Sequence, residues 1–214
     1  MNVLLITGGT FDETFAKDYI QSRTFDYIIT ADGGLAYAKA MHIVPDRIVG
    51  DFDTLSSDVL QEYEKQGIDV LQYPTKKDDT DTQLALQIAL EQRPKSITIL
   101  AGTGTRLDHT LANIGLLTLA LEQGVLAELV DSNNRIRMIK DTLVINKQEE
   151  FGTYISLIPY TERVTGITLE GFLYPLQREE LCIGVSRGIS NELINKQGII
   201  SIESGRLLVI ESKD

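Results

Sequence analysis

The stretch Arg47-Ile-Val-Gly-Asp-Phe-Asp-Thr54 joins a short apolar run to two carboxylates, those of Asp51 and Asp53. In extended backbone, residues two apart point to the same side, so these two like charges repel each other. A bound cation is the usual compensation for such a pair. The stretch can also be read as a turn in which Asp53 or Thr54 caps the helix that follows.

The same alternation of an apolar run and a helical segment continues from Met1 to about Asp131. It predicts a mostly parallel sheet covered by helices on both faces. The runs expected to be strands are Val3–Ile6, Tyr27–Ile29, Arg47–Val49, Val70–Leu71, Ile97–Leu100 and Leu126–Val130. The expected helices are residues 12–20, Gly34–Met41, Ser56–Gln66, Thr80–Glu91 and Asp108–Gln123.

The pattern changes after Asn133-Asn134. From there on, glycines separate short runs rich in Ile, Val, Leu and Thr, and no long helical pattern remains. This composition indicates a small antiparallel β-sandwich, in which Ile199–Ile202 and Leu207–Ile210 are predicted to pair as a hairpin. We therefore expect an α/β domain over residues 1–132 and an all-β sandwich over residues 133–214.

The composition narrows the kinds of partner. The chain of 214 residues has a net charge of −11 and shows no basic stripe of the kind that binds nucleic acid or membrane surfaces. No apolar run approaches the ~18 residues of a membrane span, and the opening MNVLLITGG lacks the basic segment of a secretion signal. A single cysteine, Cys182, cannot form an internal disulfide. We expect a cytoplasmic protein that binds neither nucleic acid nor membranes, with Cys182 buried.

Two acidic stretches follow predicted strands, where open parallel sheets bind ligands. In Ala31-Asp-Gly-Gly34, the glycines would let a ligand approach backbone N–H groups at a helix start, although Asp32 could simply cap that helix. In Asp78-Asp-Thr-Asp-Thr82, acidic residues complement the dipole of the next helix. Asp81, however, extends the apolar face of that helix, and an inward carboxylate near others favours a metal ion.

A glycine-rich loop, Gly102-Thr-Gly-Thr-Arg-Leu-Asp-His109, opens the last helix of the α/β half and could bind an anion. It matches neither the P-loop nor the dinucleotide fingerprint. Arg106 could clasp a phosphate, while Asp108 could hold Arg106, bind a metal through water or cap the helix. His109 could be packed, capping or catalytic. With the carboxylates, this loop is typical of phosphoryl or pyrophosphoryl transfer from a nucleotide.

These motifs together resemble the thiamine pyrophosphokinase family over nearly the whole chain. They are ADGG at 31–34, PD-x-IVGDFDT at 45–54, DDTDT at 78–82, RLDH-x-LAN at 106–113 and ISNE at 189–192. The resemblance implies an α/β domain followed by a β-sandwich, in a homodimer that binds thiamine between its subunits. It also implies transfer of pyrophosphate from ATP to the thiamine hydroxyl, with release of AMP. Thiamine is a cation, which an acidic cleft would attract.

The resemblance further implies roles for individual residues. The acidic motifs would hold Mg²⁺ and carry catalysis through Asp32, Asp51, Asp53 and Asp81. We expect the nucleotide to be bound by Gly33, Gly34, Thr103, Arg106, Asp108 and His109. Ser190 and Asn191 match the segment that contacts thiamine; from the residues alone, Val185–Glu192 could be either a hairpin loop or a substrate-lining edge. Asp32 or Asp51 could accept the proton of the thiamine hydroxyl.

The chain departs from the family pattern in two features, and two other functions are alternatives to the one that the resemblance implies. The family commonly has serine where this chain has Thr54, and the chain has no tryptophan, so an aromatic ring on thiamine would be Tyr or Phe. A metal-dependent phosphohydrolase or a γ-phosphoryl kinase would use the same carboxylates and give different products. A non-catalytic nucleotide or thiamine sensor would be expected to lack one of the acidic motifs, all of which are present.

Overall fold

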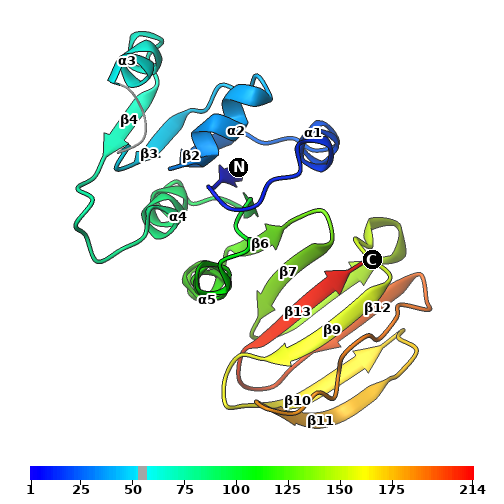
Figure 1. Ribbon diagram of the computed structural model, residues 1–214. Coiled ribbons are helices and arrows are strands. Elements are labelled where there is room, and N and C mark those ends of the chain that lie inside the picture. The colour runs from blue at the N-terminus through cyan, green and yellow to red at the C-terminus, as the bar shows by residue number, and fades with distance from the viewer. Residues whose placement is uncertain (53–56) are drawn as a thin grey trace. The chain divides into compact units, whose positions relative to one another are not determined.

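The computed structural model describes residues 1–52 and 57–214 of the chain (Figure 1). It divides into two compact units, Met1–Ser132 and Asn133–Asp214. The first is an α/β unit and the second an antiparallel sandwich, so the predicted fold class is confirmed. Within the described residues, none of the helices is both long and apolar enough to cross a membrane.

Strands and helices alternate along the first unit. They are β1 (Asn2–Ile6), α1 (Glu13–Gln21), β2 (Tyr27–Ala31), α2 (Gly34–Ala40), β3 (Arg47–Gly50), α3 (Ser57–Lys65), β4 (Asp69–Gln72), α4 (Asp81–Glu91), β5 (Ser96–Leu100), α5 (Leu107–Glu122) and β6 (Leu126–Val130). The sequence prediction agrees with these bounds to within two residues at each end in the described part.

The strands of this unit are parallel and lie in the order β4-β3-β2-β1-β5-β6. Helices cover both faces, with α1 and α2 on one side and α4 and α5 on the other (Figure 1). Residues such as Leu5 in β1 and Ile99 in β5 are fully buried, which explains their continuous apolar runs. The chain proceeds from β1 towards one edge and returns to β5 on the other side of β1. The strand order therefore reverses between β1 and β5, and the loops after these strands lie side by side.

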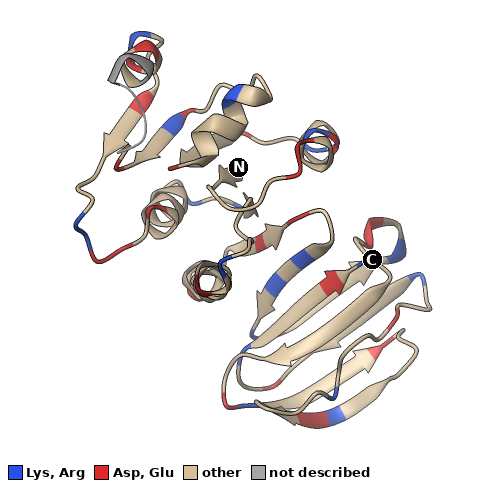
Figure 2. Cartoon of the chain, in the orientation of Figure 1, with Lys and Arg blue, Asp and Glu red and all other residues tan. Residues whose placement is uncertain are grey.

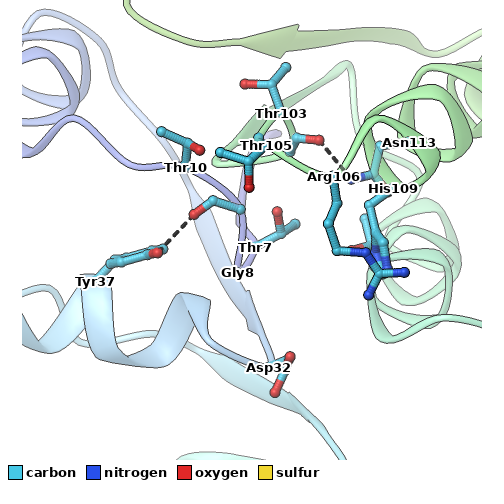
Figure 3. Close-up of a pocket in the computed structure, with 14 residues that line it drawn as sticks. Thr7, Gly8, Thr10, Asp32, Tyr37, Thr103, Thr105, Arg106, His109 and Asn113 are labelled. Carbon is cyan, nitrogen blue, oxygen red and sulfur yellow. Dashed lines mark hydrogen bonds between the residues drawn. The ribbon is translucent and has the colours of Figure 1, made fainter.

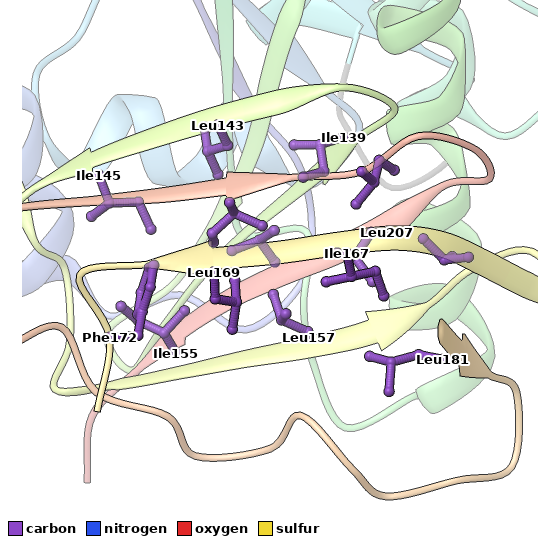
Figure 4. Close-up of a cluster of buried hydrophobic side chains, with 14 of the residues drawn as sticks. Ile139, Leu143, Ile145, Ile155, Leu157, Ile167, Leu169, Phe172, Leu181 and Leu207 are labelled. Atoms are coloured by element: carbon purple, nitrogen blue, oxygen red, sulfur yellow. The ribbon is translucent and has the colours of Figure 1, made fainter. Parts of the chain in front are cut away.

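The second unit contains two antiparallel sheets. Its elements are β7 (Asn134–Ile139), β8 (Thr142–Asn146), the 3-10 turn η1 (Lys147–Glu149), β9 (Tyr154–Pro159), β10 (Arg163–Glu170), β11 (Leu176–Cys182), β12 (Gln197–Ser201) and β13 (Leu207–Ser212). One sheet has the order β7-β13-β9 and the other β11-β10-β12-β8. Side chains of both sheets, including Leu157, Ile167 and Leu207, form one buried core (Figure 4).

The predicted hairpin in this unit is wrong. β12 pairs with β10 and β8, whereas β13 pairs with β7 and β9 in the other sheet. Their connection is tied to the start of β10, because Glu203 N donates to Thr165 O at 2.9 Å and Thr165 N donates to Ser204 O at 3.1 Å. Alternate residues of the two segments, Ile200 with Ile202 and Leu207 with Val209, face one core, but they do so from opposite sheets.

Cys182 was expected to be buried and is not. It ends the edge strand β11, and its side chain is only partly covered. The apolar neighbours that suggested a core position lie on both sides of it, and Leu181 alone points into the core while Ile183 is exposed. The alternation of an edge strand therefore decides the environment of this thiol.

Candidate active site

A pocket of about 490 Å³ lies in the first unit, where β1 and β5 end (Figure 3). Its lining comes from the loops after β1, β2 and β5 and from three helices: Thr7, Gly8, Gly9, Thr10, Asp32, Tyr37, Thr82, Gly102, Thr103, Gly104, Thr105, Arg106, His109 and Asn113. The volume is in the range of small-molecule sites. The position is the point at which the strand order reverses, where open α/β sheets bind their ligands.

The loops after β1 and β5 form one continuous wall of this pocket. Thr7 N donates to Leu100 O at 3.0 Å, Gly9 N to Ala101 O at 2.7 Å, and Thr10 N to Thr103 O at 2.7 Å. A Cβ atom on Gly9 would lie 2.3 Å from the carbonyl oxygens of Ala101 and Thr103. Only glycine therefore permits the two loops to approach this closely.

Side chains of α5 hold the glycine-rich loop in shape. The buried Asn113 donates from Nδ2 to Gly102 O at 2.7 Å, and Thr110 Oγ1 accepts from Gly104 N at 3.1 Å. Arg106 occupies the N-cap position of α5, and its own side chain makes no capping hydrogen bond. The start of α5 thus opens into the pocket beside Arg106, which is an arrangement suited to an anion.

Arg106 and Asp108 form an exposed pair at this helix start. Arg106 Nε donates to Asp108 Oδ1 at 3.2 Å and Nη2 to Oδ2 at 2.6 Å. The hydrogen bonds to Arg106 lower the pKa of the Asp108 carboxyl, and they raise the pKa of Arg106. Of the three roles considered for Asp108, the structure shows that of holding Arg106. His109 is exposed and lines the pocket, so it is not a packed residue.

Asp32 lies in the pocket wall and does not cap α2, whose N-cap is Gly33 without a side-chain hydrogen bond. Its backbone has a φ of 47°, in the left-handed region that aspartate tolerates better than most residues. Partial desolvation raises the pKa of Asp32, and the negative charges of Asp81 and Asp51 raise it further. The carboxylates of Asp81 and Asp51 are therefore close enough to affect the ionisation of Asp32.

Asp81 points inward, as its place on the helix predicted. Its side chain is 18% exposed, and Lys77 Nζ lies 3.0 Å from Oδ1. Asp81 Oδ1 is nevertheless buried without a hydrogen bond of good geometry. The capping role belongs to Thr80, whose hydroxyl accepts from Gln83 N at 3.2 Å. Asp81 therefore does not cap α4, and its charged partner in the chain is Lys77.

A divalent cation fits this set of residues. Mg²⁺ would offset the negative charges of Asp81 and Asp51, which raise the pKa of Asp32. It would also provide a partner for Asp81 Oδ1, which is buried and accepts no hydrogen bond. Among the described residues, no three acidic, His or Cys side chains converge closely enough to hold an ion by themselves. The fourth predicted ligand, Asp53, lies outside the described residues.

Gly33 and Gly34 do not line the pocket. A Cβ on Gly34 would lie 2.0 Å from Ile6 O, and one on Gly33 would lie 3.2 Å from the Cα of Gly8. These glycines let the start of α2 pack against the end of β1 and the loop after it. The structure shows that they bring two backbones together, and their predicted contact with the nucleotide stays a prediction.

Sequence reasoning missed part of the pocket lining. The Thr7–Thr10 loop carried a visible signal, since its glycine pair directly follows the first strand. Tyr37 carried none, because it reaches the pocket from inside a helix. Thr82 and Asn113 belong to the DDTDT and RLDH-x-LAN motifs but were not named as site residues. Their approach depends on how α2, α4 and α5 pack on the sheet.

In the second unit, Ser190 and Asn191 lie in the loop between β11 and β12. These strands are not neighbours, since β10 lies between them, so the hairpin-loop reading of Val185–Glu192 is wrong. Asn191 is 5% exposed, its Oδ1 accepts from Tyr174 N at 3.0 Å, and its Nδ2 donates to Tyr174 O at 2.8 Å. Ser190 is exposed and has a φ of 56°.

Residues 18–127 match the catalytic domain of thiamin pyrophosphokinase, and residues 140–207 match its vitamin B1 binding domain. The chain belongs to the thiamin pyrophosphokinase family. A thiamine pyrophosphokinase of Bacillus subtilis (strain 168) is 37% identical over 186 residues, 87% of each chain.

Solved structures agree with this assignment. The crystal structure of thiamine pyrophosphokinase from Bacillus subtilis superposes with a TM-score of 0.87 at 33% identity and covers 100% of both chains. That of thiamin pyrophosphokinase from Geobacillus thermodenitrificans has a TM-score of 0.85 at 30% identity and covers 100% of this chain and 98% of the other. The family resemblance read from the sequence motifs is thereby confirmed.

Proposed function

We propose that the pocket between the loops after β1 and β5 is where this member of the family binds ATP. There it transfers the β,γ-pyrophosphate to the hydroxyl of thiamine and releases AMP. The observation that carries the proposal is the meeting of two features in one pocket. A glycine-rich wall ends at the start of α5 beside Arg106, whose side chain makes no capping hydrogen bond. The acidic residue Asp32 lies in the same lining.

The phosphate chain would lie along the glycine-rich side of the pocket. Arg106 can donate two parallel hydrogen bonds to phosphate oxygens, at the cost of its exposed pair with Asp108. Thr103 and His109 add donors on the same side, and the N-terminus of α5 favours negative charge. Such transfer depends on positioning and charge stabilisation and needs no covalent nucleophile.

Asp32, Asp51, Asp53 and Asp81 would hold Mg²⁺, with Asp53 kept in the set as a prediction from the sequence. When bound, Mg²⁺ would neutralise charge on the transferring phosphates. Asp32 is the better placed acceptor for the thiamine proton, because it lines the pocket and its pKa is raised. Asp51 does not belong to that lining.

The second unit would supply the thiamine contacts, in agreement with the name of the domain that residues 140–207 match. The polar atoms of Asn191 are used within the unit, so we assign it to holding Tyr174 in place. Tyr174, 64% exposed, and Ser190, also exposed, are the side chains that we assign to contact with thiamine. A homodimer in the cytoplasm, without nucleic-acid or membrane partners, completes the proposal.

A product assay tests this function. Purified protein is mixed with ATP, Mg²⁺ and thiamine, and the products are resolved by anion exchange. The proposal requires AMP and thiamine diphosphate in equal amounts, and neither product when EDTA is present. ADP with thiamine monophosphate would instead indicate a γ-phosphoryl kinase, and free phosphate without a thiamine ester would indicate a hydrolase.

A further inference from the structure

The loop after β1, Thr7–Thr10, and the next residue, Phe11, precede the part of the chain that the catalytic domain model matches, which begins at residue 18. The loop nevertheless forms one wall of the pocket (Figure 3). We propose that this loop is part of the ATP site and that Tyr37 is the positioning residue that holds it there. The inference rests on the proposed function, since it assumes that ATP occupies this pocket.

Both backbone polar groups of Gly9 make hydrogen bonds, one to each of two neighbouring elements. Its N–H donates to Ala101 O at 2.7 Å, which ties it to the loop after β5. Its carbonyl accepts from the Tyr37 hydroxyl at 2.8 Å, which ties it to α2. Because no Cβ fits at Gly9, this residue has little room to shift between the two.

The aromatic ring of Tyr37 holds the far end of the same loop. It stacks on Phe11 with ring centroids 4.3 Å apart and an angle of 6° between the planes. One side chain of α2 thus fixes the loop at Gly9 through its hydroxyl and just beyond Thr10 through its ring. A stack of this kind adds to the free energy that area burial provides.

The position of the loop sets the width of the pocket. Figure 3 shows the Thr7–Thr10 loop facing Arg106 and His109, with Tyr37 behind the loop. Thr10 and Thr105 present hydroxyl groups on the wall that the two loops share, and hydroxyl groups suit the phosphates or ribose of a nucleoside triphosphate. If the loop moves away from the Arg106 side, ATP loses contacts on one flank while the carboxylates stay in place. Loss of Tyr37 should therefore weaken ATP binding without changing the chemical step.

The test uses Tyr37→Phe, which keeps the ring stack and removes only the hydroxyl that donates to Gly9. Tyr19→Phe is the matched control, because Tyr19 donates a similar hydrogen bond of 2.7 Å to Glu128 and does not line the pocket. Phe11→Leu is the second variant and removes the stack while keeping the hydroxyl. Each protein is assayed for kcat and for KM of ATP and of thiamine. The Kd for ATP is measured separately by calorimetry with Mg²⁺ present.

Tyr37→Phe should raise KM and Kd for ATP roughly threefold to tenfold, the range of one net hydrogen bond. Phe11→Leu should act in the same direction, and Tyr19→Phe should match wild type. The values of kcat and of KM for thiamine should change less than about twofold in all three. Equal ATP affinities in Tyr37→Phe and Tyr19→Phe would overturn the inference, as would a parallel rise in KM for thiamine.

Arg106→Ala separates this inference from the proposed function. If Arg106→Ala weakens ATP binding and Tyr37→Phe does not, ATP lies in the pocket but the loop is not held by Tyr37. If neither variant weakens ATP binding, ATP binds elsewhere and the proposed site itself is wrong. Weakening by both, with an unaffected Tyr19→Phe, supports both statements.

Discussion

Two groups of charged residues, one in each unit, differ in how their charges are balanced. On β13, the fully buried Glu211 accepts from Arg135 at 2.9 and 2.7 Å and also from Arg137. Figure 2 shows these basic positions on β7 beside the acidic one on β13. Here one carboxylate is matched by two guanidinium groups. Such a group stabilises the folded chain only as a complete set.

In the first unit, several carboxylates lie near one another at the edge of the sheet. Burial and the negative charges of Asp81 and Asp51 raise the pKa of Asp32, and the cation paired with Asp81 is Lys77. Like charges gathered at the edge of a sheet do not stabilise a fold, so this arrangement supports the proposed cation site. The comparison teaches that acidic residues matched by basic ones are typical of a structural group. Acidic residues that outnumber their basic neighbours are typical of a binding site.

The largest effect is expected for Glu211→Gln. Removing this charge leaves two buried guanidinium groups without their partner and should lower the free energy of unfolding by about 3–5 kcal/mol. Urea denaturation measures the change. Glu203→Gln, which breaks the exposed pair with Arg178, is the control and should cost less than about 1 kcal/mol. Equal losses in the two variants would remove the structural half of the comparison.

Asp32→Asn tests the functional half. It removes a charge from the pocket but keeps a residue that tolerates a positive φ, so kcat should fall roughly 10²–10³-fold. Thermal unfolding should show no loss of stability, since the ionised form of Asp32 is disfavoured in the folded state. Asp18→Asn, the same change on the exposed face of α1, should keep full activity. An active or a strongly destabilised Asp32→Asn protein would contradict the account.

Arg106→Ala should have a smaller effect than Asp32→Asn. Its pair with Asp108 is exposed, so the free energy of unfolding should change little. Its loss from the phosphate side of the pocket should lower kcat/KM for ATP by roughly tenfold to a hundredfold. Arg163→Ala removes an equally exposed pair with Glu180 in the second unit and is the control for the charge. A similar loss of activity in both variants would point to net charge and not to a phosphate contact.

The smallest effect concerns pH. The folded-state pKa of Asp32 is raised above its ordinary value of 3.8, so the folded state binds a proton more tightly than the unfolded state does. This contribution to stability is present below pH 3.8 and is lost as pH rises through the raised pKa. With EDTA present, the melting temperature of Asp32→Asn minus that of wild type should therefore increase from acidic to neutral pH. A difference that does not vary with pH would mean that neither burial nor the neighbouring carboxylates raise the pKa of Asp32 in the folded state.

The helices and strands of the first unit could be predicted from sequence, because most of its strands are apolar runs and its helices have their own period. The order of the strands in the sheet was not predicted. The hairpin in the second unit failed because Ile199–Ile202 and Leu207–Ile210 are both short apolar runs, and such a run does not specify the strand with which it pairs. Which sheet a strand joins depends on contacts such as Glu203 with Thr165, which no local pattern reports.

The candidate site was predictable where its residues directly follow strands. Asp32, Thr103 and Arg106 were named for that reason and lie in the pocket lining. Tyr37 was not, because it reaches Gly9 from within a helix, 28 positions along the chain. Asn191 was expected to contact thiamine, but its side chain is committed to Tyr174, a partner 17 positions away. Such contacts are set by packing, after the elements have formed.

The most direct test of the central claim is calorimetric titration of the protein with ATP, once with Mg²⁺ and once with EDTA. If the excess carboxylates of the first unit exist to hold a cation, ATP should bind at least about tenfold more tightly with Mg²⁺. That difference should disappear in Asp32→Asn and persist in Asp18→Asn. Equal affinity with Mg²⁺ and with EDTA in the wild-type protein would contradict the claim, because the acidic cluster would then have no cation to hold.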